Sequence, residues 1–238
     1  MADLGGTRQE RARVTHAAII DAAAAEFDER GYTGASIDAV AERAGLTKGA
    51  VYFHFASKAE LAGAVIARQH EVSQEYGAAA AARASSPIEA LVWSSQAIAT
   101  QMVREVVVSA GIRLSTEDAT REVDRRQEPY TDWTRIAADL FRQAVDAGEV
   151  DPAWDPELLA RVAVPAYTGV QKVSDILTER ADLYERLREL WTVLLAAVVT
   201  DAVRPRIPGL VAIIAPLDDR PGGPSDAGPP TDTHVTAP

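Results

Sequence analysis

The residues best suited to chemistry in this chain lie between Thr47 and Lys58, where small, basic and aromatic side chains follow one another. Thr47 offers a hydroxyl as a helix N-cap, and the residues after it fit a helix of about two turns. Gly49 and Ala50 leave the start of that helix bare, and Lys48 adds a positive charge. Such a helix can enter the major groove of DNA, with its first residues at base edges.

A second short helix is predicted just before this one, and a longer helix before both. Ser36 is a hydroxyl N-cap, Ile37 and Val40 follow at helical spacing, and Gly45 suits the left-handed end of a helix. Two short helices joined by a glycine-containing turn form a helix-turn-helix, which residues 10–30 would support. Spacing alone also fits two short helices in an ordinary helical core.

The side chains expected to contact DNA are small or polar residues on the two short helices and basic or aromatic residues at their flanks. They are Arg11, Ser36, Thr47, Lys48, Gly49, Ala50, Tyr52, His54 and Lys58. The cations are expected to contact phosphates and the other residues to approach base edges. Phe53 and Phe55 alternate with Tyr52 and His54 across a helix end, so we expect both phenylalanines in the core.

The charge of the chain is unusual for a DNA-binding protein. The formal net charge is −11, but residues 1–70 hold eight Lys/Arg and nine Asp/Glu, so nearly all of the excess lies after residue 70. We expect few phosphate contacts per subunit, a need for dimerisation, and an acidic body that repels DNA except on the correct face.

Composition excludes several classes of protein. The chain has 238 residues, 47% of them hydrophobic, which is enough for one or two domains with a sizeable core. It has no cysteine, no signal-peptide pattern and no apolar run approaching the 18 or so residues that span a bilayer. No catalytic triad, zinc motif or phosphate-binding loop is present, and His70 is the sole histidine of the body. We expect a soluble cytoplasmic protein with no membrane contact, no cofactor, no metal and no enzymatic activity.

The pattern after the two short helices is helical almost throughout. Capping residues and apolar spacing predict a long helix over 57–82, leading from the helix-turn-helix into the next domain, and further helices over 86–103, 106–114, 129–147, 156–178 and 182–202, with a loop over 115–127. We expect a flexible arm over 1–9, a helix-turn-helix domain over 10–56, a second domain over 57–203, and a disordered Pro/Gly-rich tail over 204–238. Within the tail, the apolar stretch 210–217 can dock on the body.

The stretch TKGAVYFHFASKAEL resembles the recognition helix and its continuation in the TetR family of one-component bacterial repressors, whose signature is T-x-x-x-[LVI]-Y-x-[HY]-F-x-x-K-x-x-L. The preceding family pattern is represented by Gly31-Tyr32 through Gly45-Leu46. The resemblance implies an all-α fold, with a three-helix DNA-binding domain and a helical ligand-binding and dimerisation domain. It also implies a homodimer bound to double-stranded palindromic operator DNA.

The last two predicted helices, over 156–178 and 182–202, are apolar on a broad face. They can close the core of the monomer, or they can pair between two subunits in a four-helix interface. The resemblance favours the interface.

Three further stretches, over 110–114, 129–133 and 167–171, resemble the γ-butyrolactone receptor branch of that family. Those Streptomyces-type receptors repress antibiotic biosynthesis until a diffusible hormone releases them from DNA. The resemblance implies that Trp133 covers a pocket and that Thr168 and Gln69 hydrogen-bond the head of a small hydrophobic hormone.

The residues expected to contact this ligand are polar or aromatic side chains that interrupt apolar helices: Gln69, Trp93, Gln96, Tyr130, Trp133, Thr168 and Gln171. Each of them alone also fits a structural role. A neutral ligand with an alkyl tail needs a mostly apolar cavity with two or three polar anchors. Since Gln69 lies on the helix leading back to the DNA-binding domain, a ligand bound to it could shift that helix.

The residues do not distinguish a butyrolactone from a butenolide or a furan. A pseudo-receptor of the same fold, answering to an antibiotic or to no ligand, is the alternative.

Overall fold

The computed structural model describes residues 8–216, which form ten α-helices and two 3-10 turns, with a single β-bridge between Val150 and Val199 and no strand in this part of the chain. The helices are α1 (Arg8–Gly34), α2 (Ile37–Arg43), α3 (Lys48–His54), α4 (Lys58–Ala81), α5 (Pro87–Arg104), α6 (Val106–Thr116), α7 (Glu128–Asp146), α8 (Pro156–Thr178), α9 (Leu183–Val198) and α10 (Ile207–Val211). The turns are η1 (Asp118–Thr120) and η2 (Arg204–Arg206). The expected all-α fold is confirmed.

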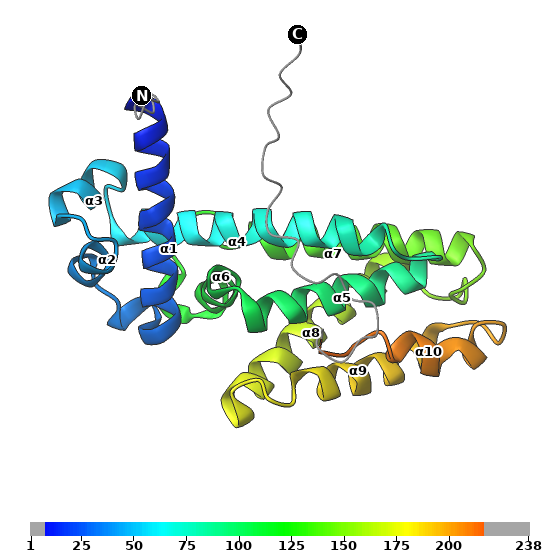
Figure 1. Cartoon of the computed structure of the whole chain (residues 1–238). Coiled ribbons are helices and arrows are strands. Elements are labelled where there is room, and N and C mark those ends of the chain that lie inside the picture. Colours follow the sequence, from blue (N-terminus) through cyan, green and yellow to red (C-terminus); the bar gives the residue numbers. More distant parts are fainter. Residues whose placement is uncertain (1–7, 217–238) are drawn as a thin grey trace, which may run out of the picture.

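Local capping explains why α2 and α3 form where they do. Ser36 Oγ accepts a hydrogen bond from the Ala39 amide at 3.1 Å, and Thr47 Oγ1 accepts one from the Ala50 amide at 3.2 Å. Between the two helices, Gly45 takes a left-handed conformation with φ of 66°, which ends α2. Helices α2 and α3 therefore pack beside α1 as the predicted helix-turn-helix, at one end of the molecule (Figure 1).

Helix α4 joins this end to the rest of the molecule. Ser57 caps it by accepting a hydrogen bond from the Glu60 amide at 3.0 Å. The buried cluster of α1–α3 also contains Leu61 of α4 together with Ala110 and Leu114 of α6. The division predicted at residue 56 therefore does not separate two independent cores, because the DNA-binding end packs directly on α6.

The body is a second, larger core. Phe141, Leu183, Leu187 and Leu195 have no exposed surface and lie in one cluster drawn from α5, α7, α8, α9 and α10. In Figure 1, α4 and α7 run along one side of the body, α5 lies in the middle, and α9 and α10 lie on the other side. None of the described helices is long and apolar enough to cross a membrane.

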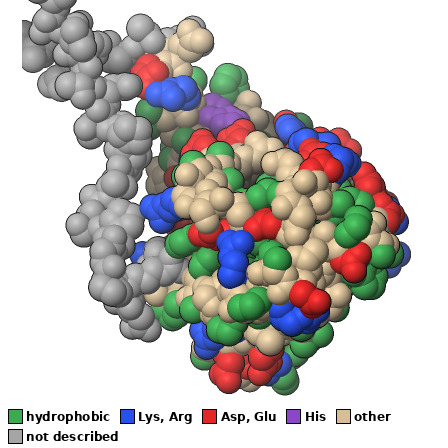
Figure 2. Space-filling model, turned by 90° about the vertical axis from the view of Figure 1, so that its right-hand side faces the viewer, with side chains coloured by type: hydrophobic (Ala, Val, Ile, Leu, Met, Phe, Trp, Pro, Cys, Tyr) green, Lys and Arg blue, Asp and Glu red, His purple; other side chains and the backbone are tan. Residues whose placement is uncertain are grey.

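The surface of the body remote from α3 is charged but mixed. Figure 2 views that end of the molecule and shows Asp/Glu and Lys/Arg side chains interspersed with apolar ones, without a large patch of one sign.

The chain begins its first helix earlier than the sequence predicts. Helix α1 includes Arg8 and Gln9, so the arm expected over 1–9 is wrong for these two residues, and residues 1–7 lie outside the described part. Gly31 leaves the helical region with φ of 68°, as expected, but helical backbone resumes up to Gly34.

The tail expected from residue 204 is wrong for residues 204–216. These form η2, α10 and a docked segment in which Leu210 is 4% exposed and Ile214 is fully buried. Gln96 of α5 donates to the Ala215 carbonyl at 2.6 Å and accepts from its amide at 3.1 Å. Apolar burial together with paired backbone groups holds the segment despite its prolines. Docking of the stretch over 210–217 is seen up to residue 216, and residues 217–238 lie outside the described range.

Candidate functional site

Helix α3 presents one face outward and one inward. Val51 is fully buried and Phe55 is 3% exposed, whereas Tyr52 is 47% and Phe53 is 83% exposed. Residues four apart share a helix face, so 51 and 55 face the core and 53 lies opposite to them. The core prediction was therefore right for Phe55 and wrong for Phe53, because helical spacing and not alternation decides it.

The start of α3 is open to solvent. Lys48 and Gly49 are exposed, and Ala50 is half-buried. Lys48 Nζ lies 2.9 Å from Asp38 Oδ2, and this hydrogen bond raises the pKa of Lys48. Because both side chains are more than half exposed, the ion pair is weak and a phosphate can compete for the ammonium group.

The other predicted DNA contacts differ in how free they are. Ser36 and Thr47 use their hydroxyls as helix caps. Lys58 Nζ donates to the Ala35 carbonyl at 3.0 Å and lies 4.6 Å from the centre of the Tyr32 ring, so it holds the domain together. Of the remaining predicted DNA contacts, Arg11 is exposed on α1 and Tyr52 is exposed on α3. The His54 ring lies against the rings of His16 and Phe53.

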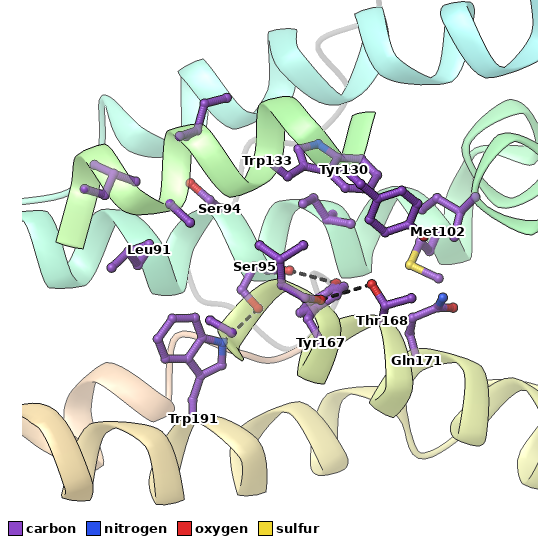
Figure 3. A pocket seen from close by; sticks show the side chains of 17 residues that line it. Leu91, Ser94, Ser95, Met102, Tyr130, Trp133, Tyr167, Thr168, Gln171 and Trp191 are labelled. Atoms are coloured by element: carbon purple, nitrogen blue, oxygen red, sulfur yellow. Dashed lines mark hydrogen bonds between the residues drawn. The ribbon is translucent and has the colours of Figure 1, made fainter. Parts of the chain in front are cut away.

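The body contains a partly open cavity of about 120 Å³ between α5, α7 and α8, bounded at one end by Trp191 of α9 (Figure 3). Its wall is mostly apolar. Four of the seven predicted ligand residues line it: Tyr130, Trp133, Thr168 and Gln171. Figure 3 shows Tyr130 and Trp133 of α7 facing Tyr167 and Thr168 of α8.

Few polar groups reach this cavity, and one of them has no partner. Thr168 Oγ1 donates to the Val164 carbonyl at 3.0 Å. Burial raises the pKa of Tyr130, so the phenol is neutral. Gln171 is 3% exposed, and no described residue hydrogen-bonds its amide. An amide that lies in an apolar cavity wall and has no partner among the described residues can anchor a polar group of a ligand.

Sequence reasoning missed part of the wall. Trp191 Nε1 donates to Ser95 Oγ at 2.8 Å, and the Tyr167 hydroxyl donates to the Ser95 carbonyl at 3.2 Å. These bonds hold α8 and α9 on α5 at the edge of the cavity. Tyr167 stands next to Thr168 in the sequence, and Trp191 interrupts an apolar helix as Trp133 does, so the signal was present.

Trp93 and Gln96, predicted as ligand residues, do not line the cavity. The α5 residues that do are 91, 94, 95, 98 and 102, which form one helical face. Trp93 lies off that face and donates from Nε1 to Glu89 at 3.2 Å, and Gln96 binds the Ala215 backbone. Because of their positions around α5, both side chains point away from the cavity and bind other parts of the protein.

Gln69 also lies outside the cavity wall, although the resemblance to γ-butyrolactone receptors implies that it hydrogen-bonds the head of the hormone. It is fully buried, and its Nε2 donates to Ser73 Oγ at 2.9 Å. A Cβ atom on Gly111 of α6 would lie 2.4 Å from Gln69 Cβ, so the glutamine packs directly on the α6 backbone. Helix α4 contributes no residue to the described wall of the cavity.

A polar contact nevertheless joins α4 to the cavity wall. His70 Nε2 lies 2.9 Å from Asp132 Oδ2, and this hydrogen bond lowers the pKa of Asp132. The His70 ring is 6.2 Å from that of Trp133, which is next to Asp132 on α7. The His70–Asp132 pair therefore joins α4 to the α7 wall of the cavity.

Comparison with known proteins places both halves of the chain. Residues 19–65 match the family described as "Bacterial regulatory proteins, tetR family", and residues 85–200 match the family described as "Tetracyclin repressor-like, C-terminal domain". The A-factor receptor protein of Streptomyces griseus is 35% identical over 212 residues, which cover 88% of this chain and 70% of that protein.

Two solved structures share the fold over most of the chain. One is a γ-butyrolactone receptor (ArpA-like protein), with a TM-score of 0.70 and 32% identity over 87% of this chain and 98% of that one. The other is the TetR family protein CprB from Streptomyces coelicolor in complex with its operator sequence, with a TM-score of 0.69 and 33% identity over 85% and 96% of the two chains. The chain therefore belongs to the tetR family of bacterial regulatory proteins, in the group that contains the A-factor receptor and the γ-butyrolactone receptors.

Proposed function

We propose that this chain, a DNA-binding repressor of the tetR type, acts as a homodimer on a palindromic operator and is released by a small hydrophobic signalling molecule. The signal is a hormone of the γ-butyrolactone, butenolide or furan type, and the regulated genes include those of antibiotic biosynthesis. The observation that carries the proposal is the apolar cavity with the unpaired amide of Gln171 in its wall.

The lining of the cavity selects for a neutral ligand. No Asp, Glu, Lys, Arg or His side chain lies in its described wall, so a charged ligand would lose its hydration without gaining an ion pair. The Gln171 amide offers two donors and an acceptor, and Thr168 lies one helical turn before it. A lactone carbonyl and a hydroxyl match these groups, and an alkyl tail fits the apolar remainder.

The size of the cavity explains how a ligand would act. At about 120 Å³ it is smaller than the roughly 300–1,000 Å³ typical of small-molecule sites. A hormone must therefore widen the space between α7 and α8. Since the His70–Asp132 pair joins α7 to α4, a ligand that favours the wider state also favours a shifted α4.

The DNA-binding role is assigned to the outer surface of α3. Its bare start at Gly49 and Ala50 permits close approach to bases, and Lys48 and Tyr52 supply polar groups beside it. Two copies of α3 in a symmetric dimer would occupy successive major grooves of a palindrome. Exposed apolar side chains of the last two long helices support that dimer: Leu158, Val162, Val173, Ile176, Leu177 and Val193.

One observation favours the alternative, a pseudo-receptor that answers to an antibiotic or to no ligand. Gln69 packs on Gly111 and not at the cavity, so one of the anchors implied by the resemblance is missing there. The alternative predicts operator binding that no γ-butyrolactone, butenolide or furan reverses.

A gel-shift titration tests the proposal. DNA from upstream of the protein's own gene is incubated with the protein and then with A-factor, other γ-butyrolactones, butenolides and furans. We expect a dimer–DNA complex that at least one compound dissociates. Trp133→Ala should keep DNA binding and lose release, because it removes the ring that covers the cavity. Absence of any complex would contradict the DNA-binding role, and normal release in Trp133→Ala would contradict the placement of the pocket.

A further inference from the structure

The turn between α8 and α9 has an unusual backbone. Glu179 and Arg180 are consecutive non-glycine residues with positive φ, at 51° and 69°. This region is disfavoured for residues with a Cβ atom, so the surrounding contacts must hold the turn in place. The Glu179 and Arg180 amides donate to the Asp175 and Ser174 carbonyls, both at 3.2 Å, which fixes the turn to the end of α8.

Asp182 strengthens this attachment. One of its carboxylate oxygens accepts hydrogen bonds from Ser174 Oγ at 2.6 Å and Thr178 Oγ1 at 2.8 Å, and the other accepts one from Arg186 Nε at 2.6 Å. These bonds lower the pKa of Asp182 to about 2, so it is ionised at neutral pH. The turn therefore moves with α8 as one unit.

Arg180 extends from this turn to two other helices. Its Nη1 donates to the Met102 carbonyl in the last turn of α5 at 3.0 Å, and to Ser109 Oγ of α6 at 2.7 Å. Its Nε lies 3.1 Å from Asp175 Oδ1, and the side chain is only 14% exposed. One guanidinium group thus joins the ends of α5, α6 and α8.

Ser109 passes the contact on to the DNA-binding end. Its hydroxyl donates to Asp28 Oδ1 of α1 at 2.6 Å. One helical turn further along α6, Arg113 donates to the Asp28 carbonyl, and Glu117 accepts the Tyr32 amide at 2.9 Å. In Figure 1, α6 lies beside the end of α1 that is remote from the N-terminus.

We propose that Arg180, Ser109 and Asp28 form a relay that positions α1 according to the state of the ligand cavity. This Arg180 relay rests on the proposed function, and it uses none of the residues of the His70–Asp132 contact between α4 and α7. Arg180 is a positioning residue, because it contacts neither the cavity nor the DNA-binding surface itself.

The helices on two sides of the cavity, α5 and α8, are both linked to Arg180. The Met102 side chain lines the cavity while its carbonyl accepts from Arg180. On α8, Gln171 lies one turn before Ser174 and Asp175, which hold the turn of Arg180. A ligand that separates α5 from α8 therefore pulls apart the acceptors of one guanidinium group. Hydrogen bonds weaken steeply with distance and angle, so a shift of about 1 Å is enough to break one.

The surroundings allow this movement. A cleft of about 330 Å³ lies beside the turn, lined by Asp28, Val103, Val106, Ser109 and Arg180 among others. Since close-packed interiors resist displacement and open clefts do not, the turn can shift here without repacking a core.

Amide hydrogen exchange of the full-length protein, without ligand or DNA, tests the link to α1. Arg180→Met should speed exchange at the end of α1, residues 23–34, by about threefold or more, because Ser109 loses its charged donor and then holds Asp28 less firmly. Arg188→Met is the matched control, since Arg188 also donates to a backbone carbonyl, that of Ile214, but far from α1. It should leave α1 unchanged. Faster exchange confined to the α8–α9 turn in Arg180→Met would overturn the relay.

A double-mutant cycle makes the test specific. In a relay, Ser109→Ala and Arg180→Met break the same path, so the double variant should exchange at α1 no faster than the more affected single variant. Additive effects would show two independent structural contacts and would overturn the relay.

Operator binding tests transmission. The probe is the γ-butyrolactone that releases the wild-type protein most strongly, with A-factor as the starting compound. An allosteric effector typically changes the affinity for a second ligand about 5–150-fold. In Arg180→Met, the factor by which the probe lowers operator affinity should fall close to one. Tryptophan fluorescence should show that the variant still binds the probe. Release equal to that of the wild type would overturn the relay. If no probe releases the wild type, the proposed function fails, and the exchange experiments still decide whether Arg180 positions α1.

Discussion

Three glutamines of the body show how the same side chain serves different purposes. Gln69 donates from Nε2 to Ser73 but its buried Oε1 has no partner among the described residues, Gln96 pairs with the Ala215 backbone, and Gln171 lies in the cavity wall. The difference comes from the neighbours, because of these three glutamines only Gln171 of α8 lines the cavity. A residue type therefore indicates a binding role only when its partners are known.

This difference predicts opposite effects on stability. Gln96→Leu should lower the free energy of unfolding by about 1–3 kcal/mol, because the Ala215 amide and carbonyl lose their partners. Gln171→Leu should leave it unchanged or raise it, because an unpaired amide is replaced by an apolar group of similar size. Urea unfolding followed by circular dichroism measures both. A larger loss in Gln171→Leu than in Gln96→Leu would show that Gln171 is a structural residue.

The two phenylalanines of α3 provide a second comparison at this scale. Phe55→Ala should cost about 3–5 kcal/mol of stability, as for other buried aromatic residues. Phe53→Ala should cost less than about 0.5 kcal/mol, because the ring is 83% exposed and surface substitutions have small effects. Thermal and urea unfolding check the pair. Equal losses would mean that Phe53 is buried in solution.

At the scale of elements, the contact between α1 and α6 depends on a break in α1. Gly31 leaves the helical conformation and turns the Tyr32 amide toward Glu117, which accepts it at 2.9 Å. A Cβ atom on Gly31 would lie 2.9 Å from both Arg113 Nη2 and Glu117 Oε1. The glycine is therefore required both by its φ of 68° and by the closeness of α6.

Gly31→Ala should lower both stability and operator affinity, because the strained backbone and the clash displace α1 from α6. Gly77→Ala, near the C-terminal end of α4, is the control, since a Cβ atom there would meet nothing within 4 Å. That change should be neutral or raise stability by up to about 1 kcal/mol through helix propensity. Unfolding curves and gel shifts of the two variants give the comparison, and a neutral Gly31→Ala would contradict the tight approach of α6.

At the scale of the whole molecule, several apolar side chains of α8 and α9 are exposed in the described part of the single chain. Val162 is 49% exposed, Ile176 69%, and Val193 of α9 71%. Contiguous exposed apolar side chains on neighbouring helices are typical of subunit interfaces. A dimer formed there would fix the separation of its two α3 helices.

Val193→Glu should therefore convert the protein to a monomer and weaken operator binding, with little loss of helix content. The charge would be buried in the interface of the dimer but exposed in the monomer. Val14→Glu on α1, where Val14 is 59% exposed, is the matched control and should remain dimeric. Sedimentation velocity measures the oligomeric state. A dimer that persists in Val193→Glu would place the interface elsewhere.

The sequence by itself determined the helix-turn-helix, the long helices of the body and the family, but not α10. Caps such as Ser36, Thr47 and Ser57 act over three residues, and Gly45 acts through its own φ, so this information is local. The family signature lies in one continuous stretch for the same reason.

Only the tertiary structure decided which polar residues meet. The packing of α5, α7 and α8 placed Gln171 at the cavity and Gln69 outside it, and docking on α5 ordered residues 204–216 against their tail-like composition. The Arg180 relay joins residues 71 and 81 positions apart along the chain. Such contacts depend on the relative placement of whole helices, which arises from the summed burial of many side chains and not from any local signal.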